Sequence, residues 1–154
     1  MAAGVTISRA RLDAFREFMN DALEGEVAAA REGDALLVDA SLTARGATID
    51  LVGRVEKAGP FGQGNPEPLF VLPGHRIVDA AVVGTDHVRA RLQAGDGARL
   101  DTIAFRARGS ELGPALLEGR GRSFHVAARL STSTYRGAER VEARIVDLAP
   151  AESP

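Results

Sequence analysis

Apolar and polar side chains alternate through most of the chain between residues 69 and 148. A period of two residues is typical of strands that bury one face. The pattern predicts five strands, which cover residues 69–72 with 75–83, 87–92, 98–106, 122–130 and 140–148. Between the third and fourth strands, residues 110–118 favour a short helix, with Pro114 in its first turn and three leucines that could plug an apolar opening, Leu112, Leu116 and Leu117.

Three antiparallel strands, a short helix and two further strands follow the order of the OB-fold, a small and partly open barrel. Such barrels bind oligonucleotides or oligosaccharides on their second and third strands and in two of their loops. Other small barrels have the same number of strands, so the pattern alone leaves this choice open. We expect a mainly β protein with some α structure (α+β), with a five-stranded OB-fold barrel over residues 69–148 and a tail over 149–154.

The first 30 residues predict a helix that has little to pack against. Ser8 can cap a helix that begins near Arg9, and its apolar residues recur every three or four positions, at Leu12, Phe15, Met19 and Leu23. The short apolar segment before Ser8 is too small to bury this stripe. Residues 1–30 are therefore interpreted as the last strand and helix of a domain whose main part lies elsewhere.

Residues 31–68 are expected to connect this segment to the barrel. Alternation predicts a strand at 35–42, and Thr48 can cap a helix that stops at Gly59-Pro60. Residues 60–68 contain too much proline and glycine for regular structure. Their glycines could present backbone N–H groups to an anion, but a rigid clamp with Phe61 and Phe70 buried is the favoured interpretation.

Composition excludes several classes of protein. The chain has no cysteine, which rules out disulfide frameworks, cysteine zinc sites and a thiol nucleophile, and favours a cytoplasmic location. It has no apolar run approaching the roughly 18 residues of a membrane span and no signal-peptide pattern, so no membrane association is expected. Residues 1–73 carry a net charge of −4 and residues 74–148 carry +3, nearly all the positive charge being arginine.

The second barrel strand and the last one hold candidate phosphate contacts. His87, Arg89 and Arg91 share one face, while the alternate residues on the other face are apolar. On an OB barrel, such a cationic face would lie where the backbone of a single strand runs, although a merely solvated face has the same pattern. Arg140 and Arg144 on the last strand are candidates for the same role.

Two loops add further candidates. The turn 132–137 carries Tyr135 and Arg136, which could stack on a base and hold a phosphate, but the tyrosine could equally pack on its neighbour. Within the loop 60–68, Gln63 and Asn65 are candidate nucleic-acid-binding residues.

No catalytic or metal-binding constellation is expected in this chain. The potential metal ligands are few, namely His75, Asp79, Asp86, His87 and His125. His75 and Asp79 would share a strand face about 13 Å apart, too far to chelate one ion. Neither paired carboxylates nor a nucleophile elbow can be identified.

Four segments of the chain resemble, in the same order, the RecJ family of single-strand-specific DNA exonucleases. They are Pro60-Phe61-Gly62-Gln63-Gly64-Asn65-Pro66-Glu67-Pro68-Leu69-Phe70, Val83-Gly84-Thr85-Asp86-His87-Val88-Arg89-Ala90-Arg91-Leu92, Asp101-Thr102-Ile103-Ala104-Phe105 and Ser133-Thr134-Tyr135-Arg136-Gly137. Met1-Ala2-Ala3-Gly4 further resembles the end of a motif that closes the second, DHHA1-type domain of these enzymes.

The resemblance implies a parent enzyme that removes nucleotides from the 5′ ends of single-stranded DNA in repair and recombination, using Mn²⁺ or Mg²⁺. The catalytic DHH motifs of the family have no counterpart in this chain, so no catalytic residue can be transferred and the chain alone is not expected to be an enzyme. Its expected partners are single-stranded DNA, the DHH and DHHA1 catalytic domains and a single-strand-binding protein. The alternative is a structural or protein-interaction module that braces the nuclease core or docks such a protein.

Overall fold

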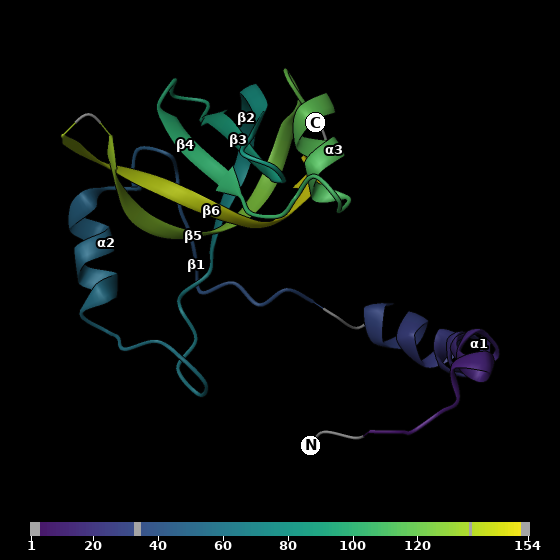
Figure 1. The fold of residues 1–154 in the computed structure, drawn as a ribbon. Helices are drawn as coiled ribbons and strands as arrows, with labels where there is room; N and C mark the ends of the chain where they lie inside the picture. Colours follow the sequence, from purple (N-terminus) through teal and green to yellow (C-terminus); the bar gives the residue numbers. More distant parts are fainter. Residues whose placement is uncertain (1–3, 33–34, 136, 152–154) are drawn as a thin grey trace. The chain divides into compact units, whose positions relative to one another are not determined.

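The computed structural model describes residues 4–32, 35–135 and 137–151 (Figure 1). It forms two compact units, residues 1–36 and residues 37–154. In chain order the elements are η1 (Arg9–Arg11), α1 (Leu12–Glu32), β1 (Ala40–Ser41), α2 (Ile49–Glu56), β2 (Phe70–Val83), β3 (His87–Gln93), β4 (Arg99–Ala104), α3 (Leu112–Glu118), β5 (Ser123–Tyr135) and β6 (Ala138–Pro150).

The long strand β2 closes the sheet, because it pairs with two different strands. Its first half pairs antiparallel with β5, and its second half pairs antiparallel with β3. The register with β5 shifts between Leu72 and His75. There Pro73 has no N–H to donate to a neighbouring strand, and Gly74 adopts a φ of 63° that few other residues tolerate. This irregularity lets one strand serve both sides of the barrel.

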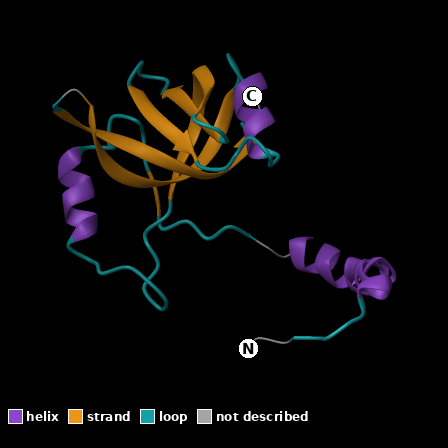
Figure 2. Cartoon of the chain, viewed as in Figure 1, coloured by secondary structure: helices purple, strands orange, loops and turns teal. Residues whose placement is uncertain are grey.

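The sheet order β1-β2-β3-β4-β6-β5 confirms the expected OB-fold. The last two barrel strands are exchanged relative to their order in the chain, so β6 lies between β4 and β5, parallel to β4 and antiparallel to β5. The helix α3 connects the third barrel strand to the fourth, as the sequence predicted. Figure 2 shows the strands curled around one another, with α2 and α3 at opposite sides of the barrel.

The interior of the barrel is filled by apolar side chains, most of them aliphatic, from all its strands. Leu72, Ile77, Leu92 and Val126 are fully buried, and Leu116 of α3 joins them. Leu112 and Leu117 pack against the same cluster while remaining partly exposed. The prediction that the leucines of this helix plug an apolar opening is therefore confirmed.

The connector helix α2 also follows the sequence pattern. The Thr48 hydroxyl accepts a hydrogen bond from the Leu51 N–H at 3.2 Å, which is the expected N-cap. Val52 is 1% exposed and belongs to the barrel core. The helix ends at Glu56, shortly before Gly59-Pro60.

The strand expected at 35–42 is much shorter in the structure. Only β1 pairs, in parallel with Phe70 and Val71 of β2, while Leu37 is 87% exposed. Alternation predicts which faces of a strand are buried, but a strand also needs a partner along its length, and the structure gives residues 35–38 none.

The first unit differs from expectation at its start. Residues 4–8 form no strand, and the helix begins with the 3-10 turn η1, to which Ser8 contributes no side-chain cap. The helix α1 follows and is longer than the stripe that predicted it. Phe18 of this helix is 65% exposed. No helix among the described residues is long and apolar enough to cross a membrane.

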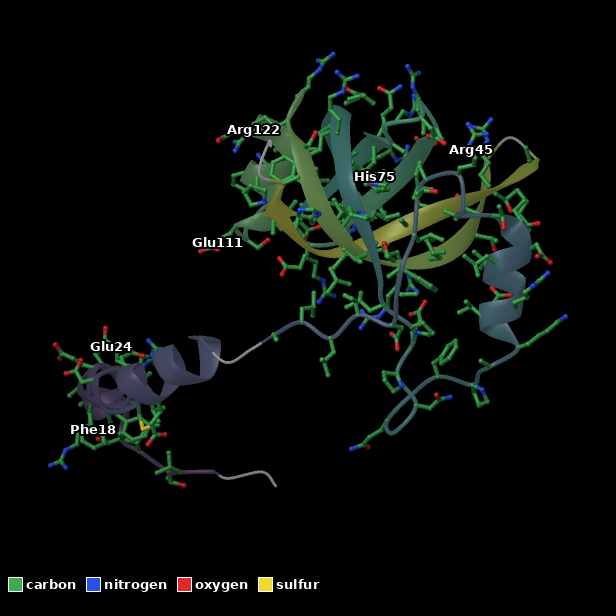
Figure 3. All side chains as sticks on the ribbon, turned by 180° about the vertical axis from the view of Figure 1, so that it is seen from behind. Phe18, Glu24, Arg45, His75, Glu111 and Arg122 are labelled. Atoms are coloured by element: carbon green, nitrogen blue, oxygen red, sulfur yellow. The ribbon has the colours of Figure 1, made fainter. Side chains whose placement is uncertain are left out.

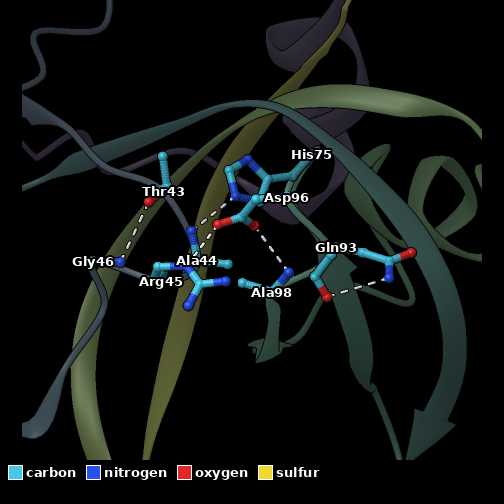
Figure 4. A network of polar contacts seen from close by, with 9 residues as sticks. Thr43, Ala44, Arg45, Gly46, His75, Gln93, Asp96 and Ala98 are labelled. Carbon is cyan, nitrogen blue, oxygen red and sulfur yellow. Dashed lines mark hydrogen bonds and ion pairs between the residues drawn. The ribbon is translucent and has the colours of Figure 1, made fainter.

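A buried histidine holds the connector on the barrel (Figure 4). His75 is 1% exposed, and its Nε2 accepts the Ala44 N–H at 3.0 Å. Its Nδ1 lies 3.0 Å from the Pro73 carbonyl oxygen, so this nitrogen carries the proton and donates. Figure 3 labels His75 among the side chains of the barrel. This histidine, considered as a metal ligand in the sequence, is instead fully used in an internal hydrogen-bond network.

A second contact fixes the same connector turn. The Arg45 Nε donates to the Asp96 Oδ2 at 2.7 Å, and the other Asp96 oxygen accepts the Ala98 N–H at 2.9 Å. The hydrogen bond from Arg45 lowers the pKa of Asp96 below its usual value. Through these two contacts, residues 44–45 join His75 in the middle of β2 to the turn between β3 and β4.

Two glycine substitutions test this packing. A Cβ at Gly113 would lie 2.2 Å from the Ala107 carbonyl oxygen, so we expect Gly113→Ala to lower the free energy of unfolding by ~2 kcal/mol or more. Gly53, inside α2, has nothing within 4 Å of the same position. Gly53→Ala should raise stability by ~0.5–1 kcal/mol, since alanine favours helix. Urea denaturation followed by circular dichroism measures both, and equal effects of the two variants would contradict the packing at α3.

Candidate nucleic-acid interface

The outer face of the barrel is polar where β3, β4, β6 and β5 adjoin. On β3 the buried Val88, Ala90 and Leu92 alternate with the exposed Arg89 and Arg91. The alternation of polar and apolar residues in the sequence predicted this separation into an outer and an inner face. The inner face is part of the barrel core. The cationic side chains of β3 are therefore available at the surface.

Strand register brings arginines from different strands to one place. Arg91 pairs with Asp101 of β4, Asp101 pairs with Glu142 of β6, and Arg140 of β6 pairs with Ser133 of β5. A hollow of about 200 Å³ lies among these rows. Its lining residues are Arg89, Arg91, Asp101, Ser133, Arg140, Val141 and Glu142. Three of the predicted phosphate contacts, which are up to 51 positions apart in the chain, thus line one hollow.

The arginines that line this hollow differ in how far neighbouring carboxylates already neutralise their charge. The Arg91 Nε donates to the Asp101 Oδ1 at 2.7 Å, and this hydrogen bond raises the pKa of Arg91 above its usual value. Arg91 therefore already has an anionic partner. Among the described residues, Arg89 forms no ion pair, so its charge is the less neutralised of the two on β3.

A second hollow of about 420 Å³ continues from the first toward the connector. It shares Asp101, Arg140 and Val141 with the first hollow and adds Arg99 of β4 and Thr48 of α2. Arg99 was missed as a candidate, although it alternates with Asp101 and so lies on the outer face of β4. The same alternation that selected Arg89 and Arg91 would have found it.

Arg144 lies outside both hollows and contacts the connector instead. Its guanidinium Nη2 donates to the Glu67 Oε1 in a short ion pair. The Arg144 Nε is buried and has no hydrogen-bond partner among the described residues. Arg144 was predicted to contact phosphate, but the structure shows it attaching the loop 60–68 to β6.

The loop 60–68 is stabilised by its own contacts. The Gly62 N–H donates to the Asn65 carbonyl oxygen at 2.9 Å, and the Asn65 N–H donates back to the Gly62 oxygen at 3.2 Å. The Asn65 side-chain amide donates to the carbonyl oxygens of Pro60, at 3.1 Å, and Ala58, at 3.3 Å. Asn65 is therefore engaged inside the loop, while Gln63 is exposed between the two bridging residues. Phe70 is buried as expected, and Phe61 only partly.

The turn between β5 and β6 is tighter than the sequence suggested. The strands extend to a pairing of Tyr135 with Ala138, so residues 132–134 are strand rather than turn. Arg136 and the side chain of Tyr135 lie outside the described part of the structure. Their proposed roles stay predictions.

The described residues do not fit a metal ion. Among residues 4–32, 35–135 and 137–151, no group of three or more histidine, cysteine, aspartate or glutamate side chains could hold one. The His87 Nδ1 accepts the Arg106 N–H at 3.0 Å, so this nitrogen is occupied as well.

Comparison with known proteins identifies the family. Residues 38–147 match the model of the RecJ OB domain. The chain belongs to this family. It is 30% identical over 152 residues to the single-stranded-DNA-specific exonuclease RecJ of Dickeya dadantii and 27% identical over 153 residues to that of Escherichia coli. In both comparisons 97% of this chain is covered but only 25% of the relative, so the chain spans about a quarter of their length.

A solved RecJ structure has the same fold. The crystal structure of RecJ from Thermus thermophilus in complex with Mn²⁺ matches with a TM-score of 0.57 and 26% identity. The match covers 97% of this chain and 21% of that one. The resemblance stated from the four sequence segments is thus confirmed for the OB domain.

The contact between Glu67 and Arg144 yields a stability prediction. Glu67→Gln should lower the free energy of unfolding by ~1 kcal/mol, because it leaves a partly buried guanidinium with an unsatisfied Nε and no carboxylate. Arg54→Gln breaks an ion pair with Asp50 whose side chains are 74% and 73% exposed, and should change stability by less than ~0.5 kcal/mol. Urea denaturation measures the free energy of unfolding of both variants. Equally small changes in the two variants would contradict a stabilising contact between Glu67 and Arg144.

Proposed function

We propose that this chain is the single-strand-binding OB portion of a RecJ-like 5′–3′ exonuclease that acts on single-stranded DNA in repair and recombination. The observation that carries the proposal is the convergence of Arg89, Arg91 and Arg140 around one surface hollow of a RecJ OB domain. Guanidinium groups suit phosphate, since they remain charged and present several N–H donors in a plane. The chain itself would bind and orient the strand.

The position of the hollow supports a single strand as the ligand. OB barrels bind oligonucleotides on the face of their second and third strands, which are β3 and β4 here. Single strands are held by a cationic groove that follows the backbone, together with aromatic groups that stack on bases. The relatives from Dickeya dadantii and Escherichia coli bear names that state specificity for single-stranded DNA.

Hydrolysis belongs to the rest of the proposed enzyme. The matched relatives are about four times as long as this chain, and the matched Thermus structure contains Mn²⁺. A divalent ion of this kind supplies electrostatic stabilisation and an activated water in phosphodiester hydrolysis. Because the described residues contain no cluster that fits the ion, we assign it to the DHH and DHHA1 catalytic domains, with the strand guided toward them by this barrel. A cytoplasmic location is part of the same proposal.

A protein-interaction role is the second candidate, and one feature favours it. A hollow of about 300 Å³ beside α3 is lined by three acids and one arginine, together with apolar residues. The acids are Glu111, Glu118 and Asp147, the arginine is Arg122, and the apolar residues include Leu112, Phe124 and Leu148. Carboxylates repel phosphate, so this surface suits a protein better than DNA. A catalytic domain or a single-strand-binding protein would be the partner under this alternative.

Affinity for DNA tests the proposal directly. We expect the double variant Arg89→Ala/Arg91→Ala to bind a fluorescein-labelled oligothymidine at least about tenfold more weakly at low salt, and to reduce the slope of log affinity against log salt by about 1.4. Arg120→Ala is the control, since Arg120 is exposed but lines neither cationic hollow. Fluorescence anisotropy measures both. Salt-independent binding, or none for the unaltered chain, would favour the protein-interaction alternative.

The ion pair between Arg91 and Asp101 leads to the opposite expectation, a substitution that strengthens DNA binding. Asp101→Asn should raise affinity for the same oligonucleotide about two- to tenfold, because it frees Arg91 and removes a charge that repels phosphate. Glu142→Gln is the matched control: Glu142 lines the same hollow but, among the described residues, forms no ion pair with either β3 arginine. A weaker Asp101→Asn complex would show that phosphate does not bind at Arg91.

A further inference from the structure

An exposed aromatic pair lies on the outer face of the barrel, beyond the hollow. Phe105 follows β4 directly and is 54% exposed, a high value for phenylalanine in a folded unit. Its ring lies 5.1 Å from that of His87, the first residue of β3, with the two planes at 77°. This edge-to-face contact is a favourable arrangement of two rings. The pair continues the register in which Val88 of β3 lies opposite Ala104 of β4.

The backbone around this pair is firmly held. The Arg106 N–H donates to the His87 Nδ1 at 3.0 Å, although Arg106 has a φ of 53°, a value unusual for a residue with a side chain. Arg108 attaches the same segment to the turn between β2 and β3, with its N–H 3.0 Å from the Asp86 oxygen and its Nη1 3.4 Å from the Thr85 oxygen. A strained conformation persists only where its surroundings enforce it. Phe105 is therefore presented on a rigid segment.

The charge around the aromatic pair suits nucleic acid. Arg89 is two residues along β3 from His87 on the same face, about 6.7 Å away at strand spacing. Arg106 and Arg108 are exposed on the segment that carries Phe105. One acid adjoins the pair, Asp86, with its Oδ1 3.3 Å from the His87 Nδ1. An apolar ring beside several guanidinium groups combines a surface for a base with donors for its phosphate.

We propose that Phe105, supported edge-on by His87, is a stacking platform for a nucleobase of the bound single strand, next to the phosphate held by Arg89. This inference rests on the proposed single-strand binding. The arginines alone would contact only the phosphate backbone, and Phe105 adds a site that contacts a base. Stacking is tolerant of sequence because every base has a π face. The platform would therefore add affinity without reading sequence.

The first test uses the absence of tryptophan from the chain. Phe105→Trp introduces a single indole, whose fluorescence a stacked base quenches. We expect quenching on addition of oligothymidine and none on addition of an abasic oligomer of the same length. Phe18→Trp on α1, where Phe18 is 65% exposed, is the matched control and should not respond. Equal responses of the two tryptophans, or equal responses of Phe105→Trp to both oligomers, would overturn the platform.

The second test separates this inference from the proposed function. Phe105→Leu should lower affinity for oligothymidine about five- to 100-fold, leaving affinity for the abasic oligomer and the salt slope unchanged. Phe105→Tyr should restore the affinity, and thermal unfolding verifies that both variants fold. Arg89→Ala/Arg91→Ala should weaken binding of both oligomers. If that double variant loses affinity while Phe105→Leu does not, the platform is refuted and single-strand binding stands. If the unaltered chain binds neither oligomer, both proposals fail.

Discussion

The geometry of this domain depends on the bend in β2. One strand of 14 residues supplies hydrogen-bonding edges to β5 and then to β3, and only this exchange of partners closes the sheet. Closure removes free strand edges and sets a strict inside and outside for every residue of the barrel. Arg89 and Arg91 face outward because Val88, Ala90 and Leu92 must face inward. The proposed binding surface is thus a consequence of how the core is enclosed.

The bend also determines how the connector is attached. His75 follows the irregularity at Pro73-Gly74, and its ring reaches both the Pro73 carbonyl and the Ala44 N–H. With one nitrogen donating and the other accepting, both polar atoms of the buried ring have a hydrogen-bond partner. The connector is further fixed by Arg45 with Asp96 and by Glu67 with Arg144. These contacts place α2 beside the second hollow, so connector and barrel line it together.

Much of the fold could be predicted from the sequence. Apolar and polar residues alternate along its strands, and its helices have apolar residues at helical spacing, with a capping residue at the start of α2. The period-two pattern found the barrel strands, and Thr48 marked the start of α2. The sequence pattern did not predict features that depend on a partner far away in the chain. It predicted a strand at residues 35–38, where the structure has no neighbouring strand. It also could not show that Arg144 contacts Glu67, which is 77 positions away. Nor could alternation show that Asp101 neutralises Arg91, since this required the register between β3 and β4.

The pairing of Arg91 with Asp101 has a consequence for the proposed binding of a single strand. The Arg91 Nε donates to the Asp101 Oδ1, so a phosphate would compete with this carboxylate for the same guanidinium. Part of the attraction between phosphate and arginine would be offset by the weakened internal ion pair, which lowers the net gain of the contact. A strand on such a surface would be held by several weak contacts instead of one strong contact.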